Sequence, residues 1–159
     1  MYDPQQLAMF AIDEFERGLE GLTEDEAAVR AKKADGSSMN AISWTVAHIA
    51  GHWLHRPERL HRYRPGSDDP APPSLVDAMA WLREGREYTE EWLGRATPEL
   101  MLRVPPGNVT GGENVGTALM RATLHTWFHA GEINAIRQML GHKEIPYVGQ
   151  LLGHLEWKP

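Results

Sequence analysis

The sequence predicts an all-α protein in which four main helices form a bundle. Apolar residues recur at every third or fourth position in several long stretches, which is the spacing of one buried helix face. Two Gly/Pro-rich segments, residues 64–74 and 104–114, separate these stretches, and no segment alternates apolar and polar residues as a half-buried strand does. The 159 residues suit one domain with one core, so residues 1–159 are predicted to be a single domain.

The first predicted helix covers residues 3–22. Asp3 is a suitable N-cap, and Pro4 is favoured at the first helical position. Thr23 and Glu26 have the spacing of a capping box, which predicts a short helix from there to about Lys33. Residues 34–38, ADGSS, are predicted to be a loop.

The second main helix is predicted over residues 40–55, with Asn40 as a cap and Pro57 ending it. At about 100° per residue, His48, His52 and His55 lie on one side of this helix, within about 60° of one another. Solvent exposure is the alternative interpretation for His52 and His55. The apolar stripe of this helix is formed by Ile42, Val46, Ile49 and Trp53.

The third main helix is predicted to begin at Ser74 and to end near Gly94 or Arg95. Residues 97–99, Thr-Pro-Glu, are typical of a cap before a short helical turn. The last long helix is predicted over residues 115–140 and to be largely buried, with Gly141 as its C-terminal cap. The tail after Pro146 is apolar enough to pack against the bundle.

The last long helix contains a pair of histidines, His125 and His129, with Glu132 near the same face. Residues spaced i, i+4 lie one turn apart on one side of a helix, so both imidazoles can approach the same ion. The alternative is that these histidines are satisfied in a core by backbone or carboxylate groups, since buried polar groups are costly when unpaired. A third ligand from another helix is needed to favour the metal site.

Composition excludes several classes of function. The chain has no cysteine, which excludes disulfides, thiolate ligands and a protein thiol nucleophile, so a metal would be held by nitrogen and oxygen. The net charge of −6 argues against nucleic-acid binding, and the basic cluster at residues 55–64 is interpreted as a solvated surface. No apolar run reaches the ~18 residues that span a bilayer, and residues 1–10 lack the features of a signal peptide. We therefore expect a cytoplasmic protein with no membrane or nucleic-acid partner.

Three stretches together resemble the DinB-like (DinB/YfiT-like) superfamily, which is unrelated in fold to the DNA polymerase sharing that name. They are MNAISWTVAHIAGHW at 39–53, TLHTWFHAGEI at 123–133 and NAIRQMLGHKEIP at 134–146. The family pattern has a histidine five residues after a serine in the second helix, then His-x-x-x-His-x-Gly-Gln-Ile in the last long helix. His48 matches the first histidine, and His125 and His129 match the pair. Glu132 stands where the family often has Gln.

The resemblance implies an up-down four-helix bundle, frequently as a homodimer, with a divalent metal ion on His48, His125 and His129. Zinc or nickel is the expected metal. Glu132 is either an additional ligand or a carboxylate that orients a ligand histidine. His52, one turn from His48, is the rival ligand on its helix and is ranked as a wall of the pocket.

Relatives include enzymes that use a low-molecular-weight thiol, maleylpyruvate-type isomerases and proteins of no known activity, and fold alone does not choose among them. The first hypothesis is a metal-dependent transferase that acts on a small-molecule substrate with a low-molecular-weight thiol as cofactor. Glu132 and His52 are the candidate catalytic residues, as proton acceptors. The alternatives are a metal-dependent hydrolase and a non-catalytic, metal-bound bundle that acts by association.

Overall fold

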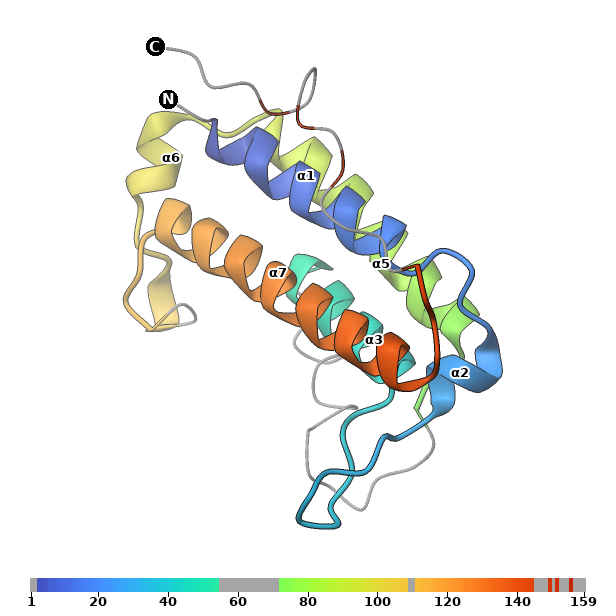
Figure 1. Ribbon diagram of the computed structural model, residues 1–159. Coiled ribbons are helices and arrows are strands. Elements are labelled where there is room, and N and C mark those ends of the chain that lie inside the picture. Colours follow the sequence, from blue (N-terminus) through green and yellow to red (C-terminus); the bar gives the residue numbers. More distant parts are fainter. Residues whose placement is uncertain are drawn as a thin grey trace.

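The computed structural model describes residues 3–54, 72–108 and 111–144, together with Gly149, Leu151 and Leu155. These residues form α-helices, one 3₁₀ turn and an isolated bridge between Lys32 and Ser38, and they contain no strand (Figure 1). The prediction of an all-α fold is therefore confirmed for this part of the chain. The α-helices are α1 (Pro4–Arg17), α2 (Glu24–Ala28), α3 (Ile42–Leu54), α5 (Leu75–Leu93), α6 (Pro98–Leu102) and α7 (Val115–Met139).

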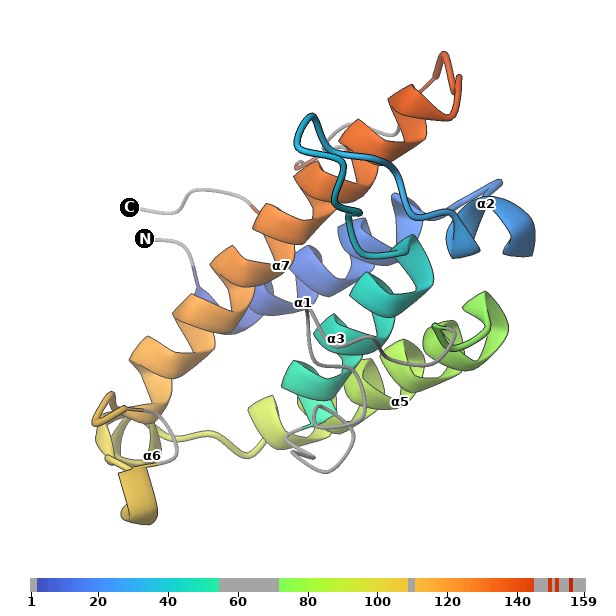
Figure 2. The same cartoon turned by 90° about the horizontal axis from the view of Figure 1, so that it is seen from below.

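The four long helices pack as two pairs that run in opposite directions (Figures 1 and 2). Helices α1 and α7 run the same way, and the Phe10 ring lies 6.1 Å from the Trp127 ring near the middle of each helix. Helices α3 and α5 run the other way, and Arg83 pairs with Glu16 across α5 and α1. The order of directions is thus up, down, down, up, so the strict alternation of an up-down bundle is not observed. The consequence for the site is that α3 lies antiparallel to α7.

The predicted N-terminal caps explain where most helices begin. The predicted caps Asp3, Ser74 and Thr97 each accept a backbone N–H bond from the first turn of the following helix, and Asn114, which was not predicted, does the same for α7. Thr23 forms the predicted capping box, because Glu26 also accepts from the Thr23 backbone N–H at 2.9 Å. Each of these contacts satisfies a backbone donor that has no partner within its own helix.

The first two helices are shorter than predicted. Helix α1 ends at Arg17 instead of near residue 22, and Gly18 caps it. Helix α2 ends at Ala28 instead of Lys33, because the following backbone makes other bonds: Met39 N–H donates to the Ala31 carbonyl at 2.8 Å. Residues 31–39 therefore fold back as a turn, since backbone groups bonded across it are not available to continue a helix.

Helix α7 ends as its sequence predicts. Gly141 adopts φ +94°, in the left-handed region that favours glycine. The Gly141 N–H donates to the Gln138 carbonyl at 3.0 Å, and the His142 N–H donates to the Arg137 carbonyl at 3.1 Å. These two bonds are those of a Schellman motif, so the predicted glycine cap is confirmed.

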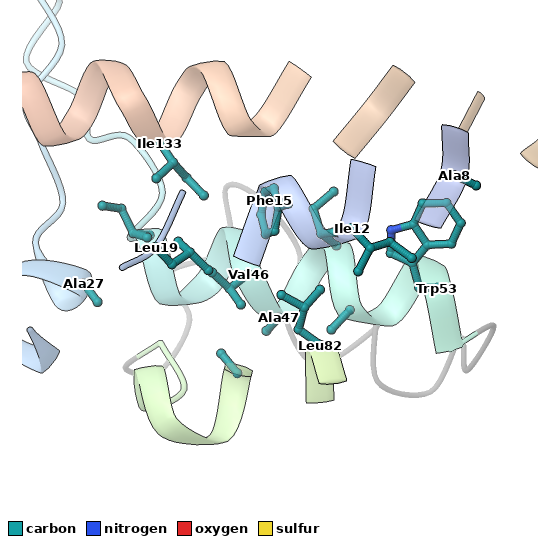
Figure 3. Packing of buried hydrophobic residues seen from close by; sticks show 14 of the residues in the cluster. Ala8, Ile12, Phe15, Leu19, Ala27, Val46, Ala47, Trp53, Leu82 and Ile133 are labelled. Carbon is teal, nitrogen blue, oxygen red and sulfur yellow. The ribbon is translucent and has the colours of Figure 1, made fainter. Parts of the chain in front are cut away.

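The core lies between the four long helices (Figure 3). Phe15 from α1, Leu82 from α5 and Ile133 from α7 are each at most 2% exposed. The predicted apolar stripe of α3, which includes Ile42 and Trp53, is also buried. Helix α3 begins at Ile42, two residues after the predicted cap Asn40.

The prediction that α7 is largely buried is wrong for one of its faces. Leu124, Phe128 and Met139 are 61%, 69% and 61% exposed, whereas Ile133 and Ile136 are in the core. At about 100° per residue, Leu124 and Phe128 lie far around the helix from Ile133. A four-helix core contacts only one side of each helix, so apolar residues on the other side stay at the surface.

Several predictions fall outside the described residues. These are the end of the second helix at His55 and Pro57, the basic cluster at 55–64, and most of the loop at 64–74 and of the tail after Pro146. Among the helices that are described, none combines the length and the apolar character that a bilayer crossing requires.

Candidate metal centre

Three histidines from two antiparallel helices meet at one point. His48 comes from α3, and His125 and His129 come from α7, one turn apart. Each offers one ring nitrogen, and these three atoms all lie within 4.8 Å of one another. His125 Nε2 lies 3.4 Å from His48 Nε2 and 2.9 Å from His129 Nε2. The structure thus brings together the three residues that the resemblance implies as ligands.

Glu132 contacts the far side of the His129 ring. Its Oε2 lies 2.7 Å from His129 Nδ1, a distance at which a ring N–H donates to the carboxylate. That bond places the proton of the neutral ring on Nδ1 and leaves the Nε2 lone pair directed at the other two histidines. Ligand histidines commonly carry such a partner, which fixes both the tautomer and the ring orientation.

The surroundings of His48 and His125 favour neutral imidazoles. Burial, and to a lesser degree the rings of His52, His125 and His129, lowers the pKa of His48 to about 3. Burial also lowers the pKa of His125, with contributions from His129 and Arg121. A neutral imidazole is the form that ligates a metal, so protons compete little for His48 and His125 near neutral pH.

His52 lies beside the three histidines. Its ring centroid is 4.6 Å from that of His125 and 4.8 Å from that of His48, with both pairs edge to face. Its nitrogens do not join the group of three that converge. His52 is half-buried and lies against the rings of His48 and His125.

Two aromatic side chains, Trp44 and Phe128, flank the histidines, and Trp44 was not singled out from the sequence. The Trp44 ring stacks on His48 at 4.9 Å with 13° between the planes, and Trp44 precedes His48 by one helical turn. The Phe128 ring stands edge-on to His129 at 5.2 Å and is mostly exposed. The i, i+4 spacing of Trp44 and His48 was the available signal, because such pairs face each other on a helix.

The donor set fits a divalent ion with nitrogen ligands. Zn–N bonds of about 2.1 Å at tetrahedral angles place two ligand nitrogens about 3.4 Å apart. The nitrogens of His48 and His125 already have that separation, and those of His125 and His129 need to part by a few tenths of an ångström. Three protein ligands leave coordination positions open, as catalytic zinc sites do.

Comparison with known families agrees with the motifs. The family model described as DinB superfamily matches residues 10–133, well over half of the chain. The matched region contains His48, His125, His129 and Glu132. No curated protein and no solved structure matches the chain. Because the family model extends from the middle of α1 through most of α7 and includes the whole histidine cluster, this chain belongs to the DinB superfamily.

Proposed function

We propose that His48, His125 and His129 bind one divalent metal ion, zinc or nickel. The observation that carries the proposal is the convergence of three ring nitrogens within 4.8 Å, one of them oriented by a carboxylate on its opposite nitrogen. Imidazole suits zinc and nickel alike, and availability decides between them. Glu132 contacts His129 Nδ1, so its role is to orient a ligand histidine.

We further propose that the protein is a metal-dependent enzyme of the thiol-dependent transferase type. A divalent ion at this position would lower the pKa of a thiol or a water bound to it. The chain has no cysteine, so the thiol would be a low-molecular-weight one from solution and the second reactant a small electrophile. The aromatic rings of Trp44 and Phe128 provide apolar contact area beside the histidines.

His52 is the proposed proton acceptor for this reaction. It is half-buried next to His48 and His125, so a thiol bound at the histidines would lie within reach of its ring. In the transfer, the thiol sulfur would form a bond to the electrophilic carbon, and the thiol proton would pass to His52. The leaving group of the electrophile would depart with the electron pair of its own bond.

The metal site is tested by metal content and affinity in His48→Ala, His125→Ala and His129→Ala against His52→Ala. We expect the first three variants to lose metal severely and His52→Ala to keep most of it, because only the first three contribute converging nitrogens. Unchanged affinity in any one of the three would show that the assigned set of ligands is wrong.

The reaction class is tested separately on the metal-loaded protein. Conjugation of a low-molecular-weight thiol to a small electrophile would support the transferase, with a lower rate in His52→Ala. Hydrolysis of an ester or amide without added thiol would support the metal-dependent hydrolase instead. A metal-loaded protein that is inert in both assays would support a bundle that acts by association.

The exposed face of α7 supports the proposed homodimer. Met120, Leu124 and Phe128 follow one another at i, i+4 and i+8, which forms an apolar stripe on the surface of one helix. Light scattering at micromolar concentration should give twice the chain mass, and Leu124→Glu should give the monomer mass. Leu102→Glu, at an exposed leucine on α6, is the matched control and should stay dimeric. A monomeric wild-type protein would contradict the proposal.

A further inference from the structure

A buried hydrogen bond joins α3 to α7 directly beside the histidines. The indole Nε1 of Trp53 donates to Thr126 Oγ1 at 3.0 Å, and the two side chains belong to residues that are 2% and 1% exposed. Figure 3 shows Trp53 at one end of the buried cluster. An indole N–H usually finds a partner when buried, and here the partner is on the helix that carries the histidine pair.

Both members of this bond are held by further contacts. The Thr126 hydroxyl donates to the Ala122 carbonyl within α7 at 2.9 Å, so its oxygen accepts from Trp53 in a defined direction. On α5, the Thr89 hydroxyl donates to the Gly85 carbonyl at 2.7 Å and lies 3.5 Å from the Trp53 carbonyl. Trp53 of α3 therefore contacts α5 through its backbone carbonyl and α7 through its buried indole ring.

The bond lies next to ligands on both helices. Thr126 follows His125 directly and precedes His129 by three residues, and Trp53 lies five residues after His48 on α3. Each residue of slippage between antiparallel helices shifts their facing side chains by about 1.5 Å. A metal site tolerates displacements of only about 0.5 Å, and apolar packing alone is not directional. The Trp53–Thr126 bond is directional, so it can set this register.

We propose that Trp53 and Thr126 are positioning residues for the histidine site, which hold His48 at ligating distance from His125 and His129. This inference rests on the proposed metal site. Neither residue touches the metal; both act through the helices that carry its ligands. The bond therefore contributes to metal affinity beyond its contribution to stability.

The test is the affinity for zinc of Thr126→Val against Thr123→Val. Valine keeps the shape of threonine and removes the hydroxyl. Thr123 is the matched control, because it is equally buried on the same helix and, among the residues that the structure describes, its hydroxyl bonds only to the Leu119 carbonyl within α7. We expect Thr126→Val to weaken zinc binding about tenfold, which is the lower end of the loss seen when a supporting contact of a metal site is removed. Thr123→Val should change zinc affinity less than about threefold. The melting temperature of each metal-free variant is measured beside it.

Two more variants separate positioning from general destabilisation. Thr126→Ser retains the acceptor and should restore wild-type zinc affinity even where its melting temperature stays low. Trp53→Phe removes the donor and should weaken zinc binding about as much as Thr126→Val, with little further loss in the double variant. Equal zinc affinity in Thr126→Val and Thr123→Val, with zinc bound by the wild type, would overturn this inference alone. A wild-type protein that takes up no zinc would overturn the proposed function and this inference with it.

Discussion

Replacement of Glu132 tests how the chain prepares a ligand histidine. The carboxylate accepts the Nδ1–H of His129 at 2.7 Å, which directs the opposite nitrogen toward His125 and His48. Glu132→Ala removes this acceptor and frees the ring to rotate or to change tautomer. Glu132→Gln keeps an oxygen at the same position but removes the charge, and glutamine is what the family often has there.

The size of the effect follows from the strength and the exposure of the bond. A hydrogen bond to a charged group contributes about 1.5–3 kcal/mol, and 2.7 Å is the short distance typical of charge-assisted bonds. The Glu132 side chain is 22% exposed, so water can replace part of the bond, and we take the lower limit. About 1.5 kcal/mol corresponds to a loss of roughly tenfold in metal affinity for Glu132→Ala. Glutamine keeps a neutral bond, so Glu132→Gln should lose less than about fivefold.

The assay is competition for zinc with a chromophoric chelator at a fixed pH. Glu91→Ala is the control for charge, because Glu91 pairs with Arg95 at 3.1 Å at the exposed surface of α5 and its loss changes the net charge equally. We expect this control to stay within about twofold of wild type, since long-range surface charges are screened by salt. Wild-type affinity in Glu132→Ala, or a greater loss in Glu132→Gln than in Glu132→Ala, would refute the reasoning.

Three other predictions concern the fold and its response to pH. Glu24 accepts the first two backbone N–H groups of α5, so Glu24→Ala should lower the melting temperature by about 2–4 °C, and Asp25→Ala on the same helix should not. Leu82 is fully buried, so Leu82→Ala should lower the unfolding free energy by about 2–5 kcal/mol in urea titrations, and Leu102→Ala at the surface by less than about 0.5 kcal/mol. Burial lowers the pKa of His48 in the folded, metal-free protein from 6.5 to about 3. As the pH drops below 6.5, this histidine takes up a proton in the unfolded chain but not in the folded one, so the free energy of unfolding should fall. Urea titrations below pH 6.5 should show a smaller fall in the free energy of unfolding for His48→Gln than for the wild type. An equal fall would mean that groups other than His48 cause it.

Helix starts could be predicted from sequence because they depend on neighbouring residues alone. The capping box of Thr23 and the caps at Ser74 and Thr97 act within one turn, and all are found in the structure. The end of α1 depends on a residue far along the chain. Arg137 of α7 donates to the carbonyls of Gly18 and Glu20, and these tertiary bonds stabilise the turn that follows Arg17. No local pattern in residues 17–22 indicates that partner.

In the candidate site, too, only the part that depends on local spacing could be predicted from the residues alone. The spacing of His125 and His129 predicted their shared face, because it follows from helix geometry within one element. The third histidine required the resemblance to a family, since helical spacing alone left His48 and His52 as rivals. The structure distinguishes them: α3 is antiparallel to α7, and only the His48 nitrogen converges with both partners.

The exposed stripe of α7 shows why a hydrophobic pattern alone could not predict burial. This helix has apolar residues on two faces, and the three other long helices cover only the face of Ile133 and Ile136. Exposed apolar side chains favour association because water solvates them poorly, so this stripe supports the proposed homodimer. On α7 that stripe continues to Phe128, whose ring touches His129. A second copy packed on this stripe would therefore lie against His129, a ligand of the proposed metal site. Self-association would then change the surroundings of the metal, so Leu124→Glu, which is expected to be monomeric, should also bind zinc with an altered affinity.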